Sequence, residues 1–160
     1  MAVYLGSNQV TMYGGQPQGG GGGGDAVVKS LINGSITSLT IPDDVTTIRK
    51  YMCAYTGTLE SVYIHNQVTS IGEYAFRNNT ALKTVVIGNG LTQIGSAAFN
   101  GCSILESVTV HALQPPTCGS NVFTNSTTKL HIYVPTESVN AYKSASGWSS
   151  YASKIQAIPE

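Results

Sequence analysis

The chain has 160 residues, and its eight lysines and arginines balance its eight aspartates and glutamates, so the formal net charge is zero. Charged residues make up 10% of the chain, whereas soluble domains average about 25%. Such a chain has no excess of positive charge that would attract the phosphate groups of a nucleic acid, which argues against a nucleic-acid-binding protein. It contains no run of about eighteen apolar residues, so no membrane-spanning helix is expected. The length predicts one domain with a short appendage.

The cysteines and the first residues bear on the compartment. Cys53, Cys102 and Cys118 are odd in number and lack a CxxC spacing, so we predict buried free thiols and neither a disulfide framework nor a zinc site. Residues 1–6 lack the basic and apolar regions of a secretory signal peptide. We therefore expect synthesis in the cytoplasm without a signal peptide, followed by retention, release on lysis or another export route, unless a natural leader is missing.

Residues 1–24 differ in composition from the remainder. The run from Val3 to Tyr13 predicts two short strands around a turn at residues 6–8, and the glycines at 19–24 predict a flexible tether. An isolated two-stranded hairpin is only marginally stable in water, so we expect it to dock on the following domain, a second copy or another protein. A disordered leader, or polyglycine segments packed in an oligomer, are the alternatives. The residues predicted to anchor the chain are Val3, Leu5, Val10 and Met12.

Residues 25–34 predict a short helix. Asp25 suits its N-cap, Gly34 suits its end, and Val28, Leu31 and Ile32 recur at helical spacing. We expect this helix to cap the N-terminal side of a domain that spans residues 25–160.

A 23-residue repeat fills most of that domain. Three segments share one pattern at this interval: Leu59–Ile64, Leu82–Ile87 and Leu105–Val110. A degenerate first copy starts near Ile36, and a fourth copy is lengthened around residues 114–116. One copy buries too little apolar surface to offset an entropy cost of about 1 to 2 kcal/mol per ordered residue, so the copies must stack.

Alternation within each copy predicts its geometry. In Val62-Tyr63-Ile64 the outer residues share one face and the middle residue points the other way, as in a β-strand. A turn, a second apolar pair and a buried Ala-Phe pair such as Ala75-Phe76 complete the coil. We expect the strands to pair in parallel, about 4.8 Å apart. One interior row is predicted to contain Ile41, Ile64, Ile87 and Val110.

Residues 135–160 predict a C-terminal cap. Pro135 suits the start of a helix that continues through Val139 and Tyr142. The side chains expected to close the last coil are Trp148, Tyr151 and Ile155.

The repeat pattern L-x-x-V-x-I-x-x-x-V-T-x-I-G-x-x-A-F-x-x-C resembles the BspA-like leucine-rich repeats. Residues 59–76 and 82–102 carry it almost completely, whereas the first copy has Arg49 in place of Gly and Met52-Cys53 in place of Ala-Phe. The resemblance implies a β-rich α/β fold, namely a leucine-rich-repeat solenoid of about four 23-residue coils with parallel strands, short turns or helices and a C-terminal helical cap. It also implies a surface-exposed binding or adhesion module of gut or oral bacteria and their phages, with no enzymatic role.

The residues that could carry chemistry do not predict a catalytic or metal site. His65 and His111 share a repeat column two coils apart, roughly 9.6 Å between backbones, so we expect exposed turn histidines and not zinc ligands. Glu60, Lys83 and Glu106 share another column and predict a surface charge ladder. A phosphate loop and a GxSxG motif are both absent from the sequence. We predict no catalytic residue, no metal and no cofactor.

The middle position of each strand predicts an exposed row across the sheet. Tyr offers rigid amphipathic contact area, and the Ser and Thr residues beside the row offer uncharged hydrogen bonds. The alternative is that β-branched and aromatic residues simply suit exposed strands. The residues predicted to bind a ligand are Thr40, Tyr63, Val86, Thr109 and Tyr133.

The favoured function is a non-enzymatic, surface-displayed binding or adhesion module. A phage virion protein, a fibre or decoration protein that contacts a host-surface protein or carbohydrate, is our first hypothesis. Residues 1–24 would attach it to a virion protein or to further copies of itself. A fragment of a secreted bacterial BspA-like adhesin is the second hypothesis, and a polysaccharide hydrolase is a third. The predicted location is the virion or the cell surface.

Overall fold

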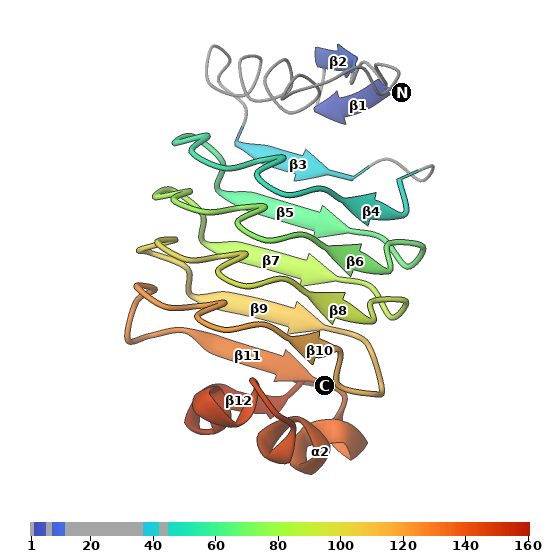
Figure 1. Ribbon diagram of the computed structural model, residues 1–160, viewed down its shortest axis with the longest axis vertical. Helices are drawn as coiled ribbons and strands as arrows, with labels where there is room; N and C mark the ends of the chain where they lie inside the picture. The colour runs from blue at the N-terminus through green and yellow to red at the C-terminus, as the bar shows by residue number, and fades with distance from the viewer. Residues whose placement is uncertain (1, 6–7, 12–36, 42–44) are drawn as a thin grey trace.

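The computed structural model describes residues 2–5, 8–11, 37–41 and 45–160, with the backbone alone for the first two segments. The predicted tether, the predicted helix at 25–34 and Met12 lie outside these residues. The described chain winds into a stack of coils with two parallel sheets along its sides (Figure 1). The six-stranded sheet contains β3 (Ser38–Thr40), β5 (Ser61–Ile64), β7 (Thr84–Ile87), β9 (Ser107–Val110), β11 (His131–Val134) and β12 (Ile155–Ala157). The four-stranded sheet contains β4 (Thr47–Ile48), β6 (Ser70–Ile71), β8 (Gln93–Ile94) and β10 (Thr117–Cys118).

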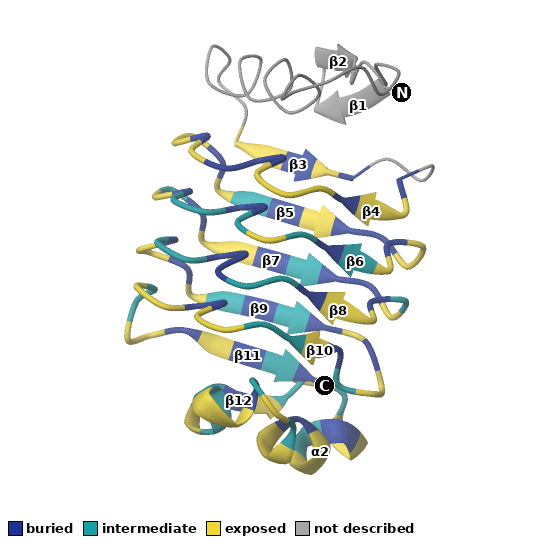
Figure 2. Cartoon of the chain, viewed as in Figure 1, coloured by how far each residue is buried: buried dark blue, intermediate teal, exposed yellow. Residues whose placement is uncertain are grey.

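The strand register confirms the repeat. Val62 pairs with Val85 and Val85 with Val108, and every step between β3 and β9 is 23 residues. Between β9 and β11 the step is 24 residues, as His131 pairs with Ser107. The predicted interior row is buried throughout, since Ile41, Ile64, Ile87 and Val110 are all at most 1% exposed. Figure 2 shows the resulting alternation of buried and exposed residues along the larger sheet.

An aromatic column fills the interior behind the sheets. The rings of Phe76 and Phe99 stack with centroids 5.1 Å apart, and Phe123 follows at 5.7 Å. Trp148 ends the column, with its centroid 6.2 Å from that of Phe123. The predicted inward position of the Ala-Phe pair is therefore confirmed, and the apolar area removed from water makes this column a main stabilising element.

A buried polar ladder runs beside the aromatic column, and its residues occupy the cysteine position of the repeat pattern. The Asn79 amide donates to the carbonyls of Cys53 and Phe76, both at 2.8 Å, and its oxygen accepts from the Thr56 backbone at 3.2 Å. In the next coils the Cys102 thiol donates to the Phe76 carbonyl and the Ser126 hydroxyl donates to the Phe123 carbonyl. Buried carbonyls need such donors, because an unpaired one costs about 1 to 3 kcal/mol.

The turns after the smaller sheet, here called the turn side, hold two columns of left-handed residues. The first column contains Tyr51, Tyr74, Ala97 and Asn121, with φ between 54° and 59°. The second contains Tyr55, Asn78, Gly101 and Asn125, with φ between 56° and 75°. A non-glycine residue in this conformation costs about 1 to 2 kcal/mol, least for asparagine. The path of the coil therefore imposes this backbone whatever side chain occupies the position.

Glycine is required at another turn-side position because successive coils touch there. A Cβ on Gly95 would lie 2.4 Å from the Glu73 nitrogen, and one on Gly72 would lie 2.6 Å from the Lys50 nitrogen. Arg49 occupies the equivalent position in the first described coil. This departure from the repeat is therefore confined to the coil at the N-terminal end of the described stack.

The C-terminal cap contains η1 (Thr136–Ser138), α2 (Val139–Ser144) and η2 (Ser149–Lys154). Tyr142 donates its hydroxyl proton to the Ala112 carbonyl at 2.8 Å, and the Trp148 indole donates to the Pro116 carbonyl at 2.7 Å. Trp148 and Ile155 are buried, whereas Tyr151 is half-buried. β12, which the sequence pattern does not predict, pairs in parallel with β11 through Ile155, Gln156 and Ala157.

The N-terminal hairpin consists of β1 (Ala2–Leu5) and β2 (Asn8–Thr11). The strands pair antiparallel, with Val3 opposite Val10 and Leu5 opposite Asn8. β1 lies next to β3 at the N-terminal end of the stack (Figure 1). The hairpin is thus placed at the edge of the larger sheet, and its anchoring role stays a prediction.

Candidate functional site

The exposed face of the six-stranded sheet aligns the residues predicted to bind a ligand. The register places Thr40 beside Tyr63, Tyr63 beside Val86, and Val86 beside Thr109, and Tyr133 follows Thr109. Gln156 of β12 extends this outward row by one position. Tyr63 is 47% exposed, whereas Val86, Thr109 and Tyr133 are half-buried. Their side chains therefore form one continuous strip across successive strands, as the alternation predicts.

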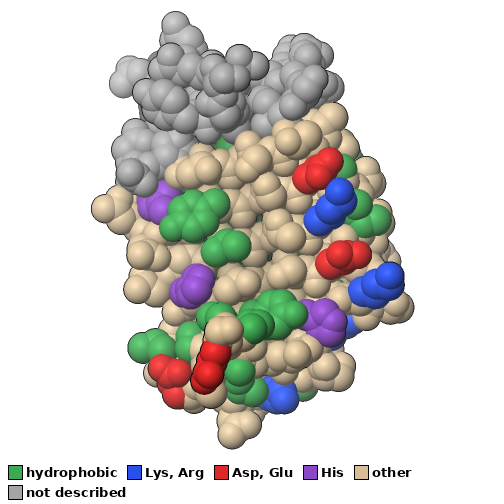
Figure 3. All heavy atoms as spheres, turned by 180° about the vertical axis from the view of Figure 1, so that it is seen from behind, with side chains coloured by type: hydrophobic (Ala, Val, Ile, Leu, Met, Phe, Trp, Pro, Cys, Tyr) green, Lys and Arg blue, Asp and Glu red, His purple; other side chains and the backbone are tan. Residues whose placement is uncertain are grey.

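A second row of small polar residues runs beside the first. Ser38, Ser61, Thr84 and Ser107 occupy consecutive strands, and His131 continues the row on β11. The Ser61 hydroxyl donates to that of Ser38 at 3.0 Å, and the ring of His131 hydrogen-bonds the Gln156 amide. Figure 3 shows this face, on which uncharged polar side chains and backbone surround scattered apolar side chains; charged groups line one edge, and further charged groups lie at the C-terminal end.

The charged edge contains the predicted ladder in part. Lys83 pairs with Glu60 at 3.1 Å, and both side chains are about half exposed. Within the described residues, Glu106 has no ion pair, so the ladder spans two coils and not three. An exposed pair of this kind contributes about 0 to 1 kcal/mol.

A hollow of about 800 Å³ opens where the strands of the larger sheet end. Tyr63 from β5 and Asn66 from the following turn form one wall, and His111, Leu113 and Gln114 form the opposite wall. The floor between them is the turn at residues 88–92. The lining carries no Asp, Glu, Lys or Arg side chain. The site therefore offers an aromatic ring, amides and an imidazole, but no formal charge.

Two local features of the sequence create the hollow. The turn containing Gly88 and Gly90 lies directly on the turn above it, because a Cβ on Gly90 would come within 1.9 Å of the Asn66 carbonyl oxygen. The lengthened turn at residues 111–116 follows in the next coil, and its Leu113 is 55% exposed. The lengthened copy is evident in the sequence, but the sequence does not predict a site at Asn66, Asn89, Leu113 or Gln114, because the hollow forms between neighbouring coils where an insertion interrupts the repeat.

The two aligned histidines lie in different environments. His111 is exposed at the wall of the hollow, as expected. His65 is 7% exposed, so its predicted exposure is wrong. The Nδ1 atom of His65 accepts a hydrogen bond from the backbone N–H of Gln67 at 3.2 Å, which holds the ring within its own short turn. Across the described residues, no three His, Cys, Asp or Glu side chains lie close enough together to hold a metal ion.

The cysteines do not offer a nucleophile. Burial raises the pKa of the Cys53, Cys102 and Cys118 thiols to about 12. Cys53 and Cys102 are buried as predicted, whereas Cys118 is half-buried. Because the thiolate is the reactive form, these groups stay protonated and unreactive at neutral pH.

Comparison with known proteins supports the repeat architecture. The profile of the family described as "BspA type Leucine rich repeat region (6 copies)" matches residues 29–150. No curated protein matches the chain. Among solved structures, a leucine rich cell surface protein from Faecalibacterium prausnitzii A2-165 is similar, with 22% identity and a TM-score of 0.42. The match covers 76% of this chain and 36% of that one. In the part of the chain that the structure describes, every helix is too short or too polar to cross a membrane.

Proposed function

The chain belongs to the family of BspA-type leucine-rich repeat proteins, and from this membership and the geometry of the sheet face we propose that it is a non-enzymatic binding module for an uncharged glycan. The binding surface consists of the outward row and the hollow beside it. Thr40, Val86, Thr109 and Tyr133 extend the contact area, and Tyr63 belongs to both parts.

The observation that carries the proposal is the neutral lining of the hollow around an exposed tyrosine. A saccharide ring presents an apolar face and a rim of hydroxyl groups. The ring of Tyr63 suits the apolar face, while Asn66, His111 and Gln114 offer donors and acceptors for hydroxyl groups. A charged ligand would find no partner of opposite sign in this lining. A host-surface protein that presents a small uncharged polar loop is the second kind of partner this surface suits.

Hydrolysis by this surface has little support. A glycosidase needs two carboxyl groups about 5 to 9.5 Å apart on either side of the scissile bond. The lining of the hollow contains none. Glu60 pairs with Lys83, and Glu106 lies one coil farther along the same edge. We therefore propose binding without turnover.

Display on a larger particle or surface is the second part of the proposal. The β1–β2 hairpin lies at the N-terminal end of the described stack, and the candidate binding surface spans the larger sheet from β3 to β11. Attachment through residues 1–24 would leave most of that face open. We propose display on a phage virion, with a secreted bacterial adhesin as the alternative carrier.

An array of neutral glycans, probed with the labelled full-length protein, tests the binding function. Tyr63→Ala and His111→Ala are each expected to weaken binding about tenfold or more. Tyr55→Asn is the matched control, because Tyr55 is 51% exposed on the turn side and away from the hollow. Equal binding by all three variants, or binding of no neutral glycan, would contradict the proposed surface.

Deletion of residues 1–24 tests the display. We expect the shortened protein to keep its melting temperature and glycan binding but to lose incorporation into particles or attachment to cells. Loss of folding on deletion would show that the hairpin belongs to the domain itself. Genes for capsid and tail proteins next to this one would favour the virion, and a leader-encoding segment upstream would favour the adhesin.

A further inference from the structure

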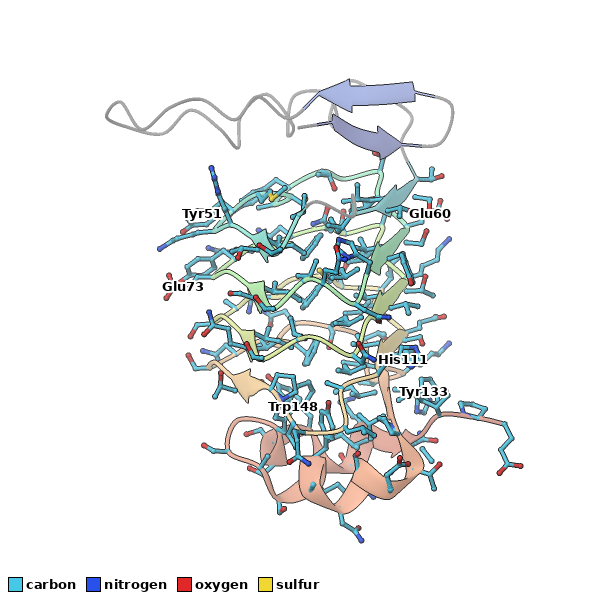
Figure 4. The ribbon with its side chains drawn as sticks, turned by 90° about the vertical axis from the view of Figure 1, so that its right-hand side faces the viewer. Tyr51, Glu60, Glu73, His111, Tyr133 and Trp148 are labelled. Carbon is cyan, nitrogen blue, oxygen red and sulfur yellow. The ribbon has the colours of Figure 1, made fainter. Side chains whose placement is uncertain are left out.

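A cluster of aromatic and basic side chains lies on the turn side, away from the hollow. The rings of Tyr51 and Tyr74 stack with centroids 4.9 Å apart and an angle of 6° between their planes. Figure 4 shows Tyr51 and Glu73 on the side of the solenoid opposite to Glu60, His111 and Tyr133. Tyr51 is 43% exposed, so part of this residue is open to solvent.

The backbone does not account for tyrosine at these positions. Tyr51 and Tyr74 have φ values of 59° and 56°, and the same column contains Ala97 and Asn121 in later coils. Asparagine tolerates this conformation better than a bulky aromatic residue. Because Tyr51 is 43% exposed, burial in the core does not explain an aromatic ring at this position.

Cations surround the tyrosine pair. The Lys50 ammonium lies 5.4 Å from the ring centroid of Tyr51 and 5.5 Å from that of Tyr74, and the Arg77 guanidinium lies 5.3 Å from the centroid of Tyr74. The Arg77 Nε is buried and has no hydrogen-bond partner within the described residues. Arg49, next to Lys50 in sequence, is exposed, and it and Arg77 are the only arginines in the sequence.

The local charge differs from that of the whole chain. Among the described residues of this cluster, three cations, Arg49, Lys50 and Arg77, stand against one carboxylate, Glu73, which is an excess of two positive charges in a protein of zero net charge. Glu73 pairs with Lys50 at 2.8 Å and orients the ammonium beside the rings. The guanidinium fork suits a carboxylate or sulfate group, and the tyrosines supply rigid contact area and hydroxyl groups.

We propose that Lys50, Tyr51, Tyr74 and Arg77 form a second binding site, which takes an acidic polysaccharide. The tyrosines contact a sugar ring, and Arg77 and Lys50 bind its carboxylate or sulfate group. A nucleic acid fits less well, because binding a chain of phosphates needs a larger basic field than two excess charges. This site and the neutral hollow are independent, so one can fail without the other.

Binding of the full-length protein to immobilised heparin and polygalacturonate tests the site, with dextran as the neutral polymer and single-stranded DNA as the phosphate polymer. We expect retention on at least one of the acidic polysaccharides at low salt, release at high salt, and no retention on dextran. Retention on heparin alone identifies sulfate as the group bound, and retention on polygalacturonate identifies carboxylate. No retention on either, or equal retention on DNA, would overturn the proposal.

A matched lysine provides the control. Lys50 and Lys83 each pair with a glutamate one coil away, at 2.8 and 3.1 Å, and their side chains are 54% and 50% exposed. Lys50→Gln and Arg77→Gln are each expected to weaken acidic polysaccharide binding about tenfold, whereas Lys83→Gln should leave it unchanged. An equal loss in Lys83→Gln would show attraction by overall charge and would contradict a defined site.

Replacement of the aromatic rings separates binding from folding. Tyr51→Asn keeps a residue that suits the left-handed backbone, so it should fold normally while binding falls at least threefold. Tyr63→Ala, which alters the hollow, should bind acidic polysaccharide as the wild type does. Unchanged binding in Tyr51→Asn would remove the tyrosine from the site.

Discussion

The sheet side and the turn side of the solenoid differ in how strongly the backbone restricts the residue types they accept. On the sheet side, inward residues are aliphatic and outward residues are free to vary, because extended backbone accepts any side chain that points to solvent. On the turn side, left-handed columns and a glycine column fix the backbone, and buried polar groups lie beside the aromatic column. Tyr63 on the sheet side therefore lies on backbone that accepts any outward side chain, whereas Tyr51, Tyr55 and Tyr74 lie on left-handed backbone that disfavours a bulky one.

The largest effect is expected where the sheet side is buried. Ile64→Asp places an unpaired charge in a fully buried position and should abolish the cooperative fold, at a cost above about 4 kcal/mol. Tyr63→Asp, one residue away and facing outward, should cost less than about 1 kcal/mol. Thermal unfolding followed by circular dichroism measures both. Similar melting temperatures for the two variants would remove the distinction between the inward and outward faces.

The second largest loss of stability is expected on the turn side, where a glycine lies in close contact with the neighbouring coil. Gly95→Ala directs a methyl group to within 2.4 Å of the Glu73 backbone, so we expect a loss of about 3 kcal/mol. Gly57→Ala meets nothing within 4 Å but keeps a φ of +67°, so we expect a loss of about 1 kcal/mol from the backbone alone. Urea denaturation measures the difference, and equal losses would mean that close coil contact is not the reason for glycine.

Disrupting the buried polar ladder should lower the free energy of unfolding slightly less than Gly95→Ala does. Asn79→Ala removes the donor to the Cys53 and Phe76 carbonyls and should lower the free energy of unfolding by about 2 kcal/mol. Asn79→Cys should recover part of this loss of stability. The reason is that Cys102, the equivalent residue of the next coil, already donates its thiol proton to a carbonyl of the ladder, that of Phe76. Urea titration of the three proteins gives the order, and a thiol variant less stable than the alanine variant would contradict the ladder.

The smallest effect has the opposite sign. Tyr55 has a φ of 62° and is exposed, and the equivalent residue of the next coil is Asn78. Tyr55→Asn relieves the backbone and keeps the hydrogen bond from the residue 55 amide to the Arg77 carbonyl, so stability should rise by about 0.5 to 1 kcal/mol. Differential scanning calorimetry detects the upward shift. A fall would show that the ring at this position contributes to folding.

The regular part of the molecule could be predicted from sequence because its signal repeats. The apolar columns at Ile64 and Phe76 recur every 23 residues, and alternation alone places Tyr63 on the outward face. Register, parallel pairing and the buried row follow from the same interval.

Structural features whose equivalent positions hold different residue types could not be predicted from the sequence. Thr56, whose hydroxyl donates to the Asn79 side-chain oxygen, Asn79, Cys102 and Ser126 form one ladder with four different side chains. Tyr74, Ala97 and Asn121 share only a backbone angle. The hollow arises where the repeat is interrupted, and β12 is a short strand that follows a helix instead of a turn. In each case the determining factor is contact with the neighbouring coil, which one repeat does not encode.

Trp148 gives the solenoid an optical probe at one end. It is the only tryptophan in the chain, and it lies fully buried where the aromatic column ends, with the Tyr142 ring edge-on at 4.9 Å. Its emission therefore reports solvent entry at the last coil alone, while circular dichroism averages over the whole ladder of strands. If the two signals change together during denaturation, the stack melts as one unit, and if emission shifts first, the stack frays from the C-terminal end.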